Sequence, residues 1–165
     1  NQLSIGDALA VASLTKKKIS KIDFKKFHPS GSLGARLKTV EDLMLTGEKI
    51  PFVNENLKMI DALKIISTKK LGVLIVRNNR KITTGIVTDG QIRRVNQTKK
   101  SISNLLVKDI MTTSPIKIEK DELSAKALSI MNERKITSLC VYEKKNKKKT
   151  IGVLHIHNIL ENNIS

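Results

Sequence analysis

The chain has 165 residues, of which 39% are hydrophobic, 28% charged and 2% aromatic, with one cysteine and a formal net charge of +16. This length allows a buried aliphatic core, whereas one cysteine excludes an intramolecular disulfide and no apolar run could span a membrane, so we expect a soluble cytoplasmic protein. The excess of lysine raises nucleic acid as a partner, but no stacking aromatics or nucleic-acid motif accompany it, and we predict none.

Residues 5–14 predict an alanine-rich amphipathic helix. A helix with such small side chains usually packs tightly against a neighbouring surface, and the residues that follow do not supply one. We therefore expect the chain to be a fragment of a longer protein, with 1–37 as a helical segment that ends a preceding domain.

The stretch 22–37 is the most distinctive in the chain. His28-Pro29-Ser30-Gly31 predicts a turn, followed by a helix that Ser32 can cap. Taken alone, a histidine before a proline indicates a turn residue.

The segment 40–44 (Val-Glu-Asp-Leu-Met) precedes an extended stretch that contains Pro51 and Val53. A proline at this point is typical of an edge strand. An amphipathic helix follows, capped within 54–56, and its apolar stripe consists of Leu57, Ile60, Leu63 and Ile66.

Strand-forming residues at 71–76 and at Ile86-Val87 precede a polar turn. Thr88 or Asp89 can cap the helix that begins near Gln91. A strand, a sharp turn and a helix N-terminus bring backbone N–H groups and a carboxylate to one place, where a small molecule can bind. The alternative is that both residues only cap the helix.

The same order of elements recurs in the second half of the chain. Gly152 follows Gly85 by 67 residues, and Val-Lys-Asp-Ile-Met at 107–111 repeats 40–44 at the same offset. Two copies are too few for a solenoid and predict a pseudo-twofold pair. The lysine run within 144–149 falls between two strands of the second copy and predicts a solvated hairpin loop, with a general attraction for anionic metabolites as the alternative.

The two copies differ at the turn. His155 occupies the position of Thr88, and Ile156 replaces Asp89. A carboxylate can accept hydrogen bonds from both ribose hydroxyls and isoleucine cannot, so the first copy is predicted to hold the ribose. His155 and His157 could donate to a phosphate or face another domain. Two histidines do not make a zinc site, and we predict no metal.

These copies resemble a tandem of cystathionine-β-synthase (CBS) domains, ligand-sensing modules that pair into a disc. The resemblance rests on the V-x-D-[LI]-M segments, the amphipathic helices, the hydrophobic strands and Gly-Ile-Val-Thr-Asp at 85–89, and it runs from about 38 to 163. It implies an α/β fold of two βαββα-like repeats about a pseudo-twofold, with CBS domain 1 at 38–100 and CBS domain 2 at 101–165. It also implies a cleft lined by Pro51, Val53, Ile86, Thr88 and Asp89, and self-association into a dimer of modules.

Gly-Asp-Ala-Leu-Ala-Val-Ala at 6–12, then the His28 stretch, then a CBS pair resembles the C-terminal half of the arabinose-5-phosphate isomerase family. In that family a sugar isomerase (SIS) domain precedes the CBS tandem. The resemblance implies that 1–37 ends an SIS domain, that the parent chain is a tetramer acting in Kdo and lipopolysaccharide biosynthesis, and that His28 is an active-site proton donor or orienter. Ser30 and Ala35 depart from the family pattern, and the fragment alone is not expected to be active.

Two function classes remain open. The pair could regulate the isomerase by sensing a nucleotide or nucleotide-sugar, with CMP-Kdo or another cytidine nucleotide as the first candidate and AMP or ATP as the second. Alternatively, it could be an interaction module that stabilises the oligomer with both clefts empty. A free-standing nucleotide sensor on an unrelated enzyme or transporter loses weight because of the His28 stretch. No cofactor is expected to be required.

Overall fold

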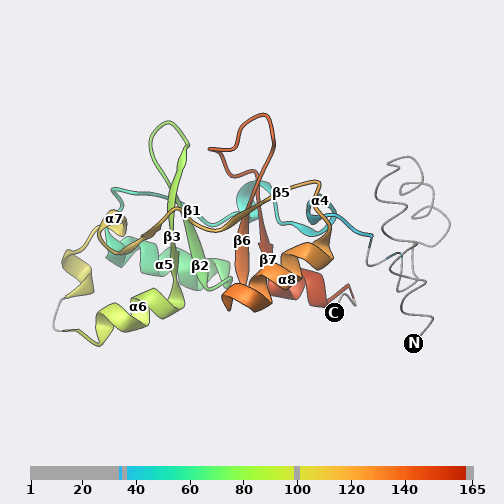
Figure 1. Ribbon diagram of the computed structural model, residues 1–165. Coiled ribbons are helices and arrows are strands. Elements are labelled where there is room, and N and C mark those ends of the chain that lie inside the picture. The colour runs from blue at the N-terminus through green and yellow to red at the C-terminus, as the bar shows by residue number, and fades with distance from the viewer. Residues whose placement is uncertain (1–33, 35–36, 99–100, 163–165) are drawn as a thin grey trace.

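The computed structural model describes residues 34, 37–98 and 101–162 (Figure 1). His28 and most of the predicted helical segment 1–37 lie outside these residues. The described residues form two βαββα units, one for each sequence copy, which confirms the predicted α/β fold. None of the described helices is both long and apolar enough to cross a membrane.

Each unit follows its sequence copy element by element. The first consists of β1 (Phe52–Asn54), α5 (Met59–Lys69), β2 (Val73–Arg77), β3 (Thr83–Thr88) and α6 (Asp89–Asn96). The second consists of β5 (Lys117–Glu119), α8 (Ser124–Arg134), β6 (Ser138–Tyr142), β7 (Gly152–His155) and α9 (Ile156–Leu160). The connecting segments contain α4 (Val40–Leu43), η1 (Gly47–Lys49), η2 (Ile102–Asn104), α7 (Val107–Ile110) and β4 (Thr112–Thr113).

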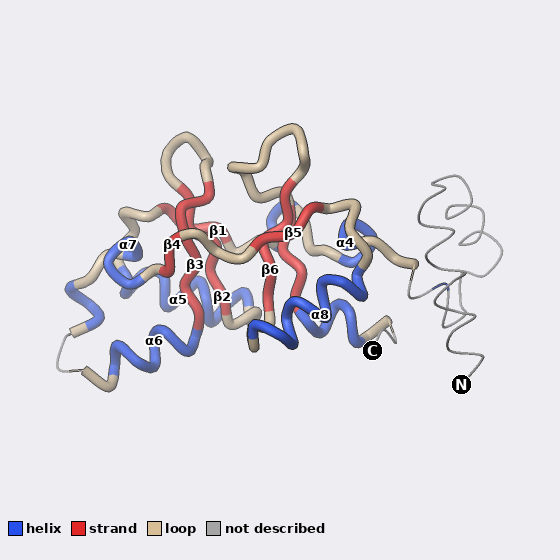
Figure 2. The backbone as a smooth tube through the Cα atoms, viewed as in Figure 1, coloured by secondary structure: helices blue, strands red, loops and turns tan. Residues whose placement is uncertain are grey.

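Each unit contains one small mixed sheet. In the first, β2 pairs in parallel with β1 and antiparallel with β3, and β4 adds to the other edge of β3. In the second, β6 pairs in parallel with β5 and antiparallel with β7. Figure 2 shows the strands of both sheets running up the middle of the molecule, with α5, α6 and α8 along its lower side.

The segment before each unit crosses to the other unit. Before the second unit, Thr112 pairs with Ile86 of the first. Before the first unit, Leu45 forms the corresponding bridge with Val153 of the second. The sequence division at residue 100 therefore separates two copies along the chain, but each copy begins on its neighbour's sheet.

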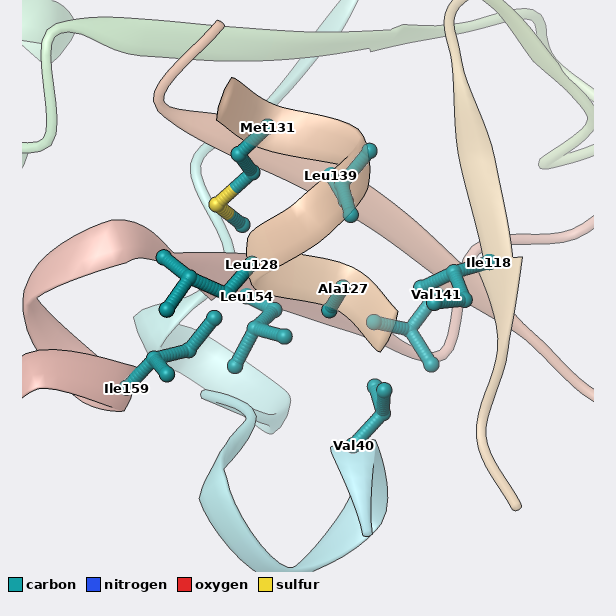
Figure 3. Packing of buried hydrophobic residues seen from close by; sticks show 9 residues of the cluster. All are labelled: Val40, Ile118, Ala127, Leu128, Met131, Leu139, Val141, Leu154 and Ile159. Atoms are coloured by element: carbon teal, nitrogen blue, oxygen red, sulfur yellow. The ribbon is translucent and has the colours of Figure 1, made fainter. Parts of the chain in front are cut away.

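Three aliphatic clusters form the core. The cluster of the second unit, drawn in Figure 3, includes Val40 from the crossing helix α4 together with Ala127, Met131 and Leu154. Val107 from α7 is buried in the first unit's cluster in the same way. A third cluster joins the two sheets and consists of Ile50, Ile75, Cys140 and Val153. None of the buried hydrophobic side chains described is aromatic, as the composition predicts.

The start of α5 differs from the sequence prediction. The helix begins at Met59 with Lys58 as N-cap, and Asn54 instead accepts a hydrogen bond from the Asn56 backbone in a separate turn. The reason is that the Met59 N–H donates to the Leu105 carbonyl, which fixes the chain in an extended form up to Lys58. The buried face therefore includes Met59 and Ala62, whereas Ile60 is 47% exposed, and its predicted core position is wrong.

Candidate functional site

Thr88 lies where β3 ends and α6 begins, and it is the N-cap of that helix. Its Oγ1 accepts a hydrogen bond from the Gln91 N–H at 3.3 Å, while Gln91 Oε1 accepts one from the Thr88 N–H at 2.7 Å. This reciprocal arrangement is a capping box. The predicted capping role of Thr88 is confirmed.

Gln91 also fixes the crossing segment. Its side chain is buried, and Nε2 donates to the Ile110 carbonyl at 3.2 Å and to the Thr112 hydroxyl. One side chain therefore joins the first turn of α6 to the strand that pairs with β3. Gln91 was not among the predicted site residues, although its Thr-x-x-Gln spacing from Thr88 is that of a capping box.

A cavity of about 440 Å³ opens beside this turn, between the two units. Its walls come from the end of β3 and the start of α6, from the crossing segment 112–116, and from 135–138 at the start of β6. The volume lies within the range of small-molecule sites, roughly 300–1,000 Å³. The residues that line it include Ile86, Arg94, Thr112, Ile116, Lys135 and Ser138.

The polar groups of this cleft favour an anion. Arg94 and Lys135 are exposed at its wall, and neither forms an ion pair with another residue that the structure describes. No carboxylate is among the described residues that line it. Opposite charges attract more strongly beside a low-dielectric wall than in open water, so the cleft is electrostatically suited to a phosphate.

Ser138 supplies a polar atom without a partner. The residue is 8% exposed, and its buried Oγ makes no hydrogen bond to any described residue. A buried hydroxyl without a partner costs free energy, about 1–3 kcal/mol. Because Ser138 lines the cleft, a bound molecule that reaches the buried Oγ would remove that cost.

The predicted site residues of the first copy are divided by the structure. Ile86 and Thr88 line the cleft, whereas Asp89 does not. The Asp89 N–H donates to the Gly72 carbonyl, and a Cβ added to Gly72 would lie 2.8 Å from Asp89 Oδ2, so the carboxylate sits over that turn. Pro51 and Val53 also lie outside the lining of this cleft.

Pro51 and Val53 have structural contacts of their own. The Pro51 carbonyl accepts a hydrogen bond from the Ile75 N–H at 2.9 Å. Val53 is 4% exposed and belongs to the first unit's core cluster. Their role in ligand binding, like the catalytic role of His28, stays a prediction.

In the second unit, His155 takes the place of Thr88 as the N-cap of α9. Its Nδ1 accepts a hydrogen bond from the His157 N–H at 3.2 Å, and the two rings stack with centroids 4.8 Å apart. Burial, and then the neighbouring His157, lower the pKa of His155. Within the described ranges, no group of three or more His, Cys, Asp or Glu residues could hold a metal ion.

The second cleft differs in its chemistry. A more open hollow of about 490 Å³ lies between the segment 45–49 that precedes the first unit and the end of α5, and Leu45 and Leu71 line it together with Glu48, Lys49 and Lys69. Leu45 and Leu71 correspond to Thr112 and Ile136 of the first cleft. Here an acidic side chain is present, and a leucine replaces the threonine hydroxyl.

Comparison with known proteins gives the following similarities. The CBS domain model matches residues 40–97 and 107–164. Arabinose 5-phosphate isomerase KdsD of Escherichia coli (strain K12) is 37% identical over 159 residues, which cover 96% of this chain and 48% of the relative. The corresponding protein of Salmonella typhimurium (strain LT2) is 38% identical with the same coverage. The chain thus spans about half the length of these curated relatives.

Two solved structures share the fold. The structure of CBSX2 in complex with AMP has a TM-score of 0.65 and 28% identity, and the match covers 74% of this chain and 93% of that one. The CBS domain pair of MJ0100, in complex with 5-methylthioadenosine and S-adenosyl-L-methionine, has a TM-score of 0.66 at 18% identity, covering 75% and 94%. The second likeness concerns the fold alone.

Proposed function

Since the chain belongs to the CBS-domain family and contains a tandem pair, we propose that its first cleft binds a nucleotide and thereby regulates an arabinose 5-phosphate isomerase. The observation that carries the proposal is the cleft itself. Among the residues that the structure describes, its lining holds a buried hydroxyl without a partner at Ser138, two cations without an ion pair, and no carboxylate.

The charge distribution suggests how the nucleotide lies. Its phosphate belongs between Arg94 and Lys135, the two cations of the cleft. The base belongs against the apolar wall formed by Ile86 and Ile116, within reach of Ser138 Oγ. This pose keeps the phosphate away from Asp89, whose carboxylate would repel it.

The proposed ribose contact is not Asp89, the residue predicted from the sequence. Asp89 lies over the Gly72 turn, whereas Thr112 lines the cleft, and its hydroxyl bonds among the described residues only as an acceptor, from Gln91 Nε2. A hydroxyl that accepts one hydrogen bond can still donate another. We therefore assign the ribose to Thr112 rather than to the carboxylate.

AMP is the first candidate ligand, because the solved CBS pair with 28% identity is a complex with AMP. CMP-Kdo is the second, because the curated relatives are arabinose 5-phosphate isomerases and feedback from the end of their pathway would use that molecule. In the whole protein, nucleotide binding would change the isomerase rate, with His28 acting in the catalytic part. The alternative remains an interaction module whose clefts stay empty.

Isothermal titration calorimetry of this chain with AMP, ATP, CMP and CMP-Kdo tests the proposal. We expect heat of binding with AMP, and Arg94→Gln should weaken that binding by about tenfold because a charge-assisted hydrogen bond is lost. Arg93→Gln is the matched control, since Arg93 is the exposed neighbour on the same helix and does not line the cleft. Absence of heat with all four nucleotides would favour the interaction module.

Two further variants separate the contacts. Ser138→Ala should weaken AMP binding, since the ligand would lose the partner that the buried hydroxyl offers. Asp89→Asn should leave it nearly unchanged if the carboxylate lies over Gly72 as observed. A large loss with Asp89→Asn would restore the ribose contact predicted from the sequence.

A further inference from the structure

A third cavity, of about 360 Å³, lies at the other end of β3, where the two hairpin loops rise side by side. In Figure 1 these loops are the green one after β2 and the orange one after β6. Its lining includes the start of β3, one residue of β5 and the lysine loop 147–149. The nucleotide cleft uses the opposite end of β3, so the two cavities have different walls except for Ser114 and Pro115.

Four lysines line this cavity: Lys117, Lys147, Lys148 and Lys149. None of the four forms an ion pair with a residue in the described part of the chain, and no described carboxylate is in the lining. Glu143, at the start of the same loop, pairs with Lys145 at 3.7 Å. The rim of the cavity therefore carries four positive charges that no carboxylate in the described part of the chain neutralises, and a bound anion would relieve their mutual repulsion.

The lysine loop is held in place by hydrogen bonds. The Lys148 carbonyl accepts from the Thr83 N–H at 2.9 Å, and the Lys147 carbonyl accepts from Lys117 Nζ at 2.8 Å. The hydroxyls of Thr83 and Thr150 lie 2.6 Å apart across the junction of the two units. Because the loop is already ordered over the cavity, a ligand does not bear the cost of ordering it.

The remaining lining suits a small polar molecule attached to the anion. Thr113 and Ser114 line the cavity, and neither side-chain hydroxyl makes a hydrogen bond with another residue that the structure describes. On one side lies the Tyr142 ring, with Lys117 Nζ 5.1 Å from its centroid. These hydroxyls can bond to hydroxyls of a ligand while the lysines hold its phosphate.

We propose that this cavity is a binding site for a small phosphorylated metabolite, separate from the nucleotide cleft. The lysines hold the phosphate, and the hydroxyls of Thr113 and Ser114 contact the rest of the molecule. The site goes beyond the proposed nucleotide binding and does not depend on it, because Arg94, Lys135 and Ser138 take no part in it.

Nitrogen-15-labelled chain titrated with ribose 5-phosphate, followed by NMR and calorimetry, tests the site. The amide signals of Thr83 and Lys148 should shift on binding. The double substitution Lys148→Gln/Lys149→Gln should weaken binding at least about tenfold, as loss of charge-assisted contacts requires. The matched control Lys144→Gln/Lys145→Gln makes the same charge change in the same loop, at exposed residues outside the cavity, and should change affinity less than about twofold.

Four outcomes would overturn the proposal. Equal losses with both double substitutions would mean that a diffuse field of lysines attracts phosphate. A loss with Arg94→Gln as large as that with the cavity pair would place the phosphate in the nucleotide cleft. Tighter binding of a single-stranded RNA oligomer, with the same lysine dependence, would mark the loop as a nucleic-acid surface. Titration with ribose should not shift the amide signals, and a shift equal to that caused by ribose 5-phosphate would show that the phosphate does not contribute to binding.

Discussion

Gln91→Ala should destabilise the chain by removing the hydrogen bonds that join α6 to the crossing segment. The side chain is buried and makes four hydrogen bonds, to the backbone and hydroxyl of Thr88, to the Ile110 carbonyl and to Thr112. Alanine removes all of them and leaves the Thr88 N–H and the Ile110 carbonyl without this partner. The lost cap contact costs about 1 kcal/mol and a buried group without a partner about 1–3 kcal/mol, so we expect a loss of about 2–4 kcal/mol.

Urea unfolding followed by circular dichroism measures this loss as a lower midpoint at an unchanged m-value. Gln97→Ala is the control, because Gln97 ends the same helix and is exposed. Gln91→Glu should fall between wild type and Gln91→Ala: it keeps an acceptor for the Thr88 N–H but has no donor for the Ile110 carbonyl. A loss below about 1 kcal/mol for Gln91→Ala, equal to that of Gln97→Ala, would refute the idea that Gln91 joins α6 to the crossing segment.

Three other substitutions or conditions probe separate features. Gly85→Ala should lower the melting temperature, because its Cβ would lie 2.7 Å from the Thr112 carbonyl, whereas Gly90→Ala, with its nearest neighbour at 3.6 Å, should not. Lowering the pH should destabilise the chain, because folding lowers the pKa of His155. The stability that this histidine contributes is present above its unfolded pKa near 6.5 and is lost as the pH falls through the lower folded pKa. His155→Ser should remove this pH dependence while keeping a side chain that can cap the helix. Burial raises the pKa of the Cys140 thiol to about 11, so alkylation by iodoacetamide at neutral pH should be slow until urea unfolds the chain.

Periodicity and repetition in the sequence predicted the elements and their pseudo-twofold pairing, and the resemblance to CBS domains implied the βαββα fold. The hydrophobic strands, the offsets of 65 and 67 residues and the turn at Thr88 all correspond to observed elements. The start of α5 was predicted wrongly, because local sequence patterns do not include tertiary backbone contacts. A polar triplet at 54–56 resembles a helix start, but the start was decided by the backbone contact between Met59 and Leu105, which sequence spacing does not reveal.

The cleft was predicted less completely, because its walls come from parts of the chain far apart in sequence. Asp89 is predicted from the sequence as the ribose ligand because a carboxylate can accept hydrogen bonds from both hydroxyls. In the structure, the turn directs this carboxylate toward Gly72. Arg94, Lys135 and Ser138 carry no motif and meet only because the crossing segment brings the two units together. The crossing segments also explain the glycines that open both repeated motifs. A Cβ added to Gly85 or Gly152 would collide with Met111 or Met44 of the segment that crosses over it.

The crossing segment also predicts that the two proposed sites influence each other. Ser114 and Pro115 line both cavities, and Thr112, two residues earlier, is fixed by Gln91. Because both ligands would contact this segment in its described position, each stabilises the conformation that the other binds, so binding should be cooperative and reciprocal. AMP affinity measured by calorimetry should rise by about fivefold as ribose 5-phosphate reaches saturation, the low end for coupled sites. An AMP affinity that stays constant at every concentration of ribose 5-phosphate would show that the shared residues are a rigid wall that transmits nothing.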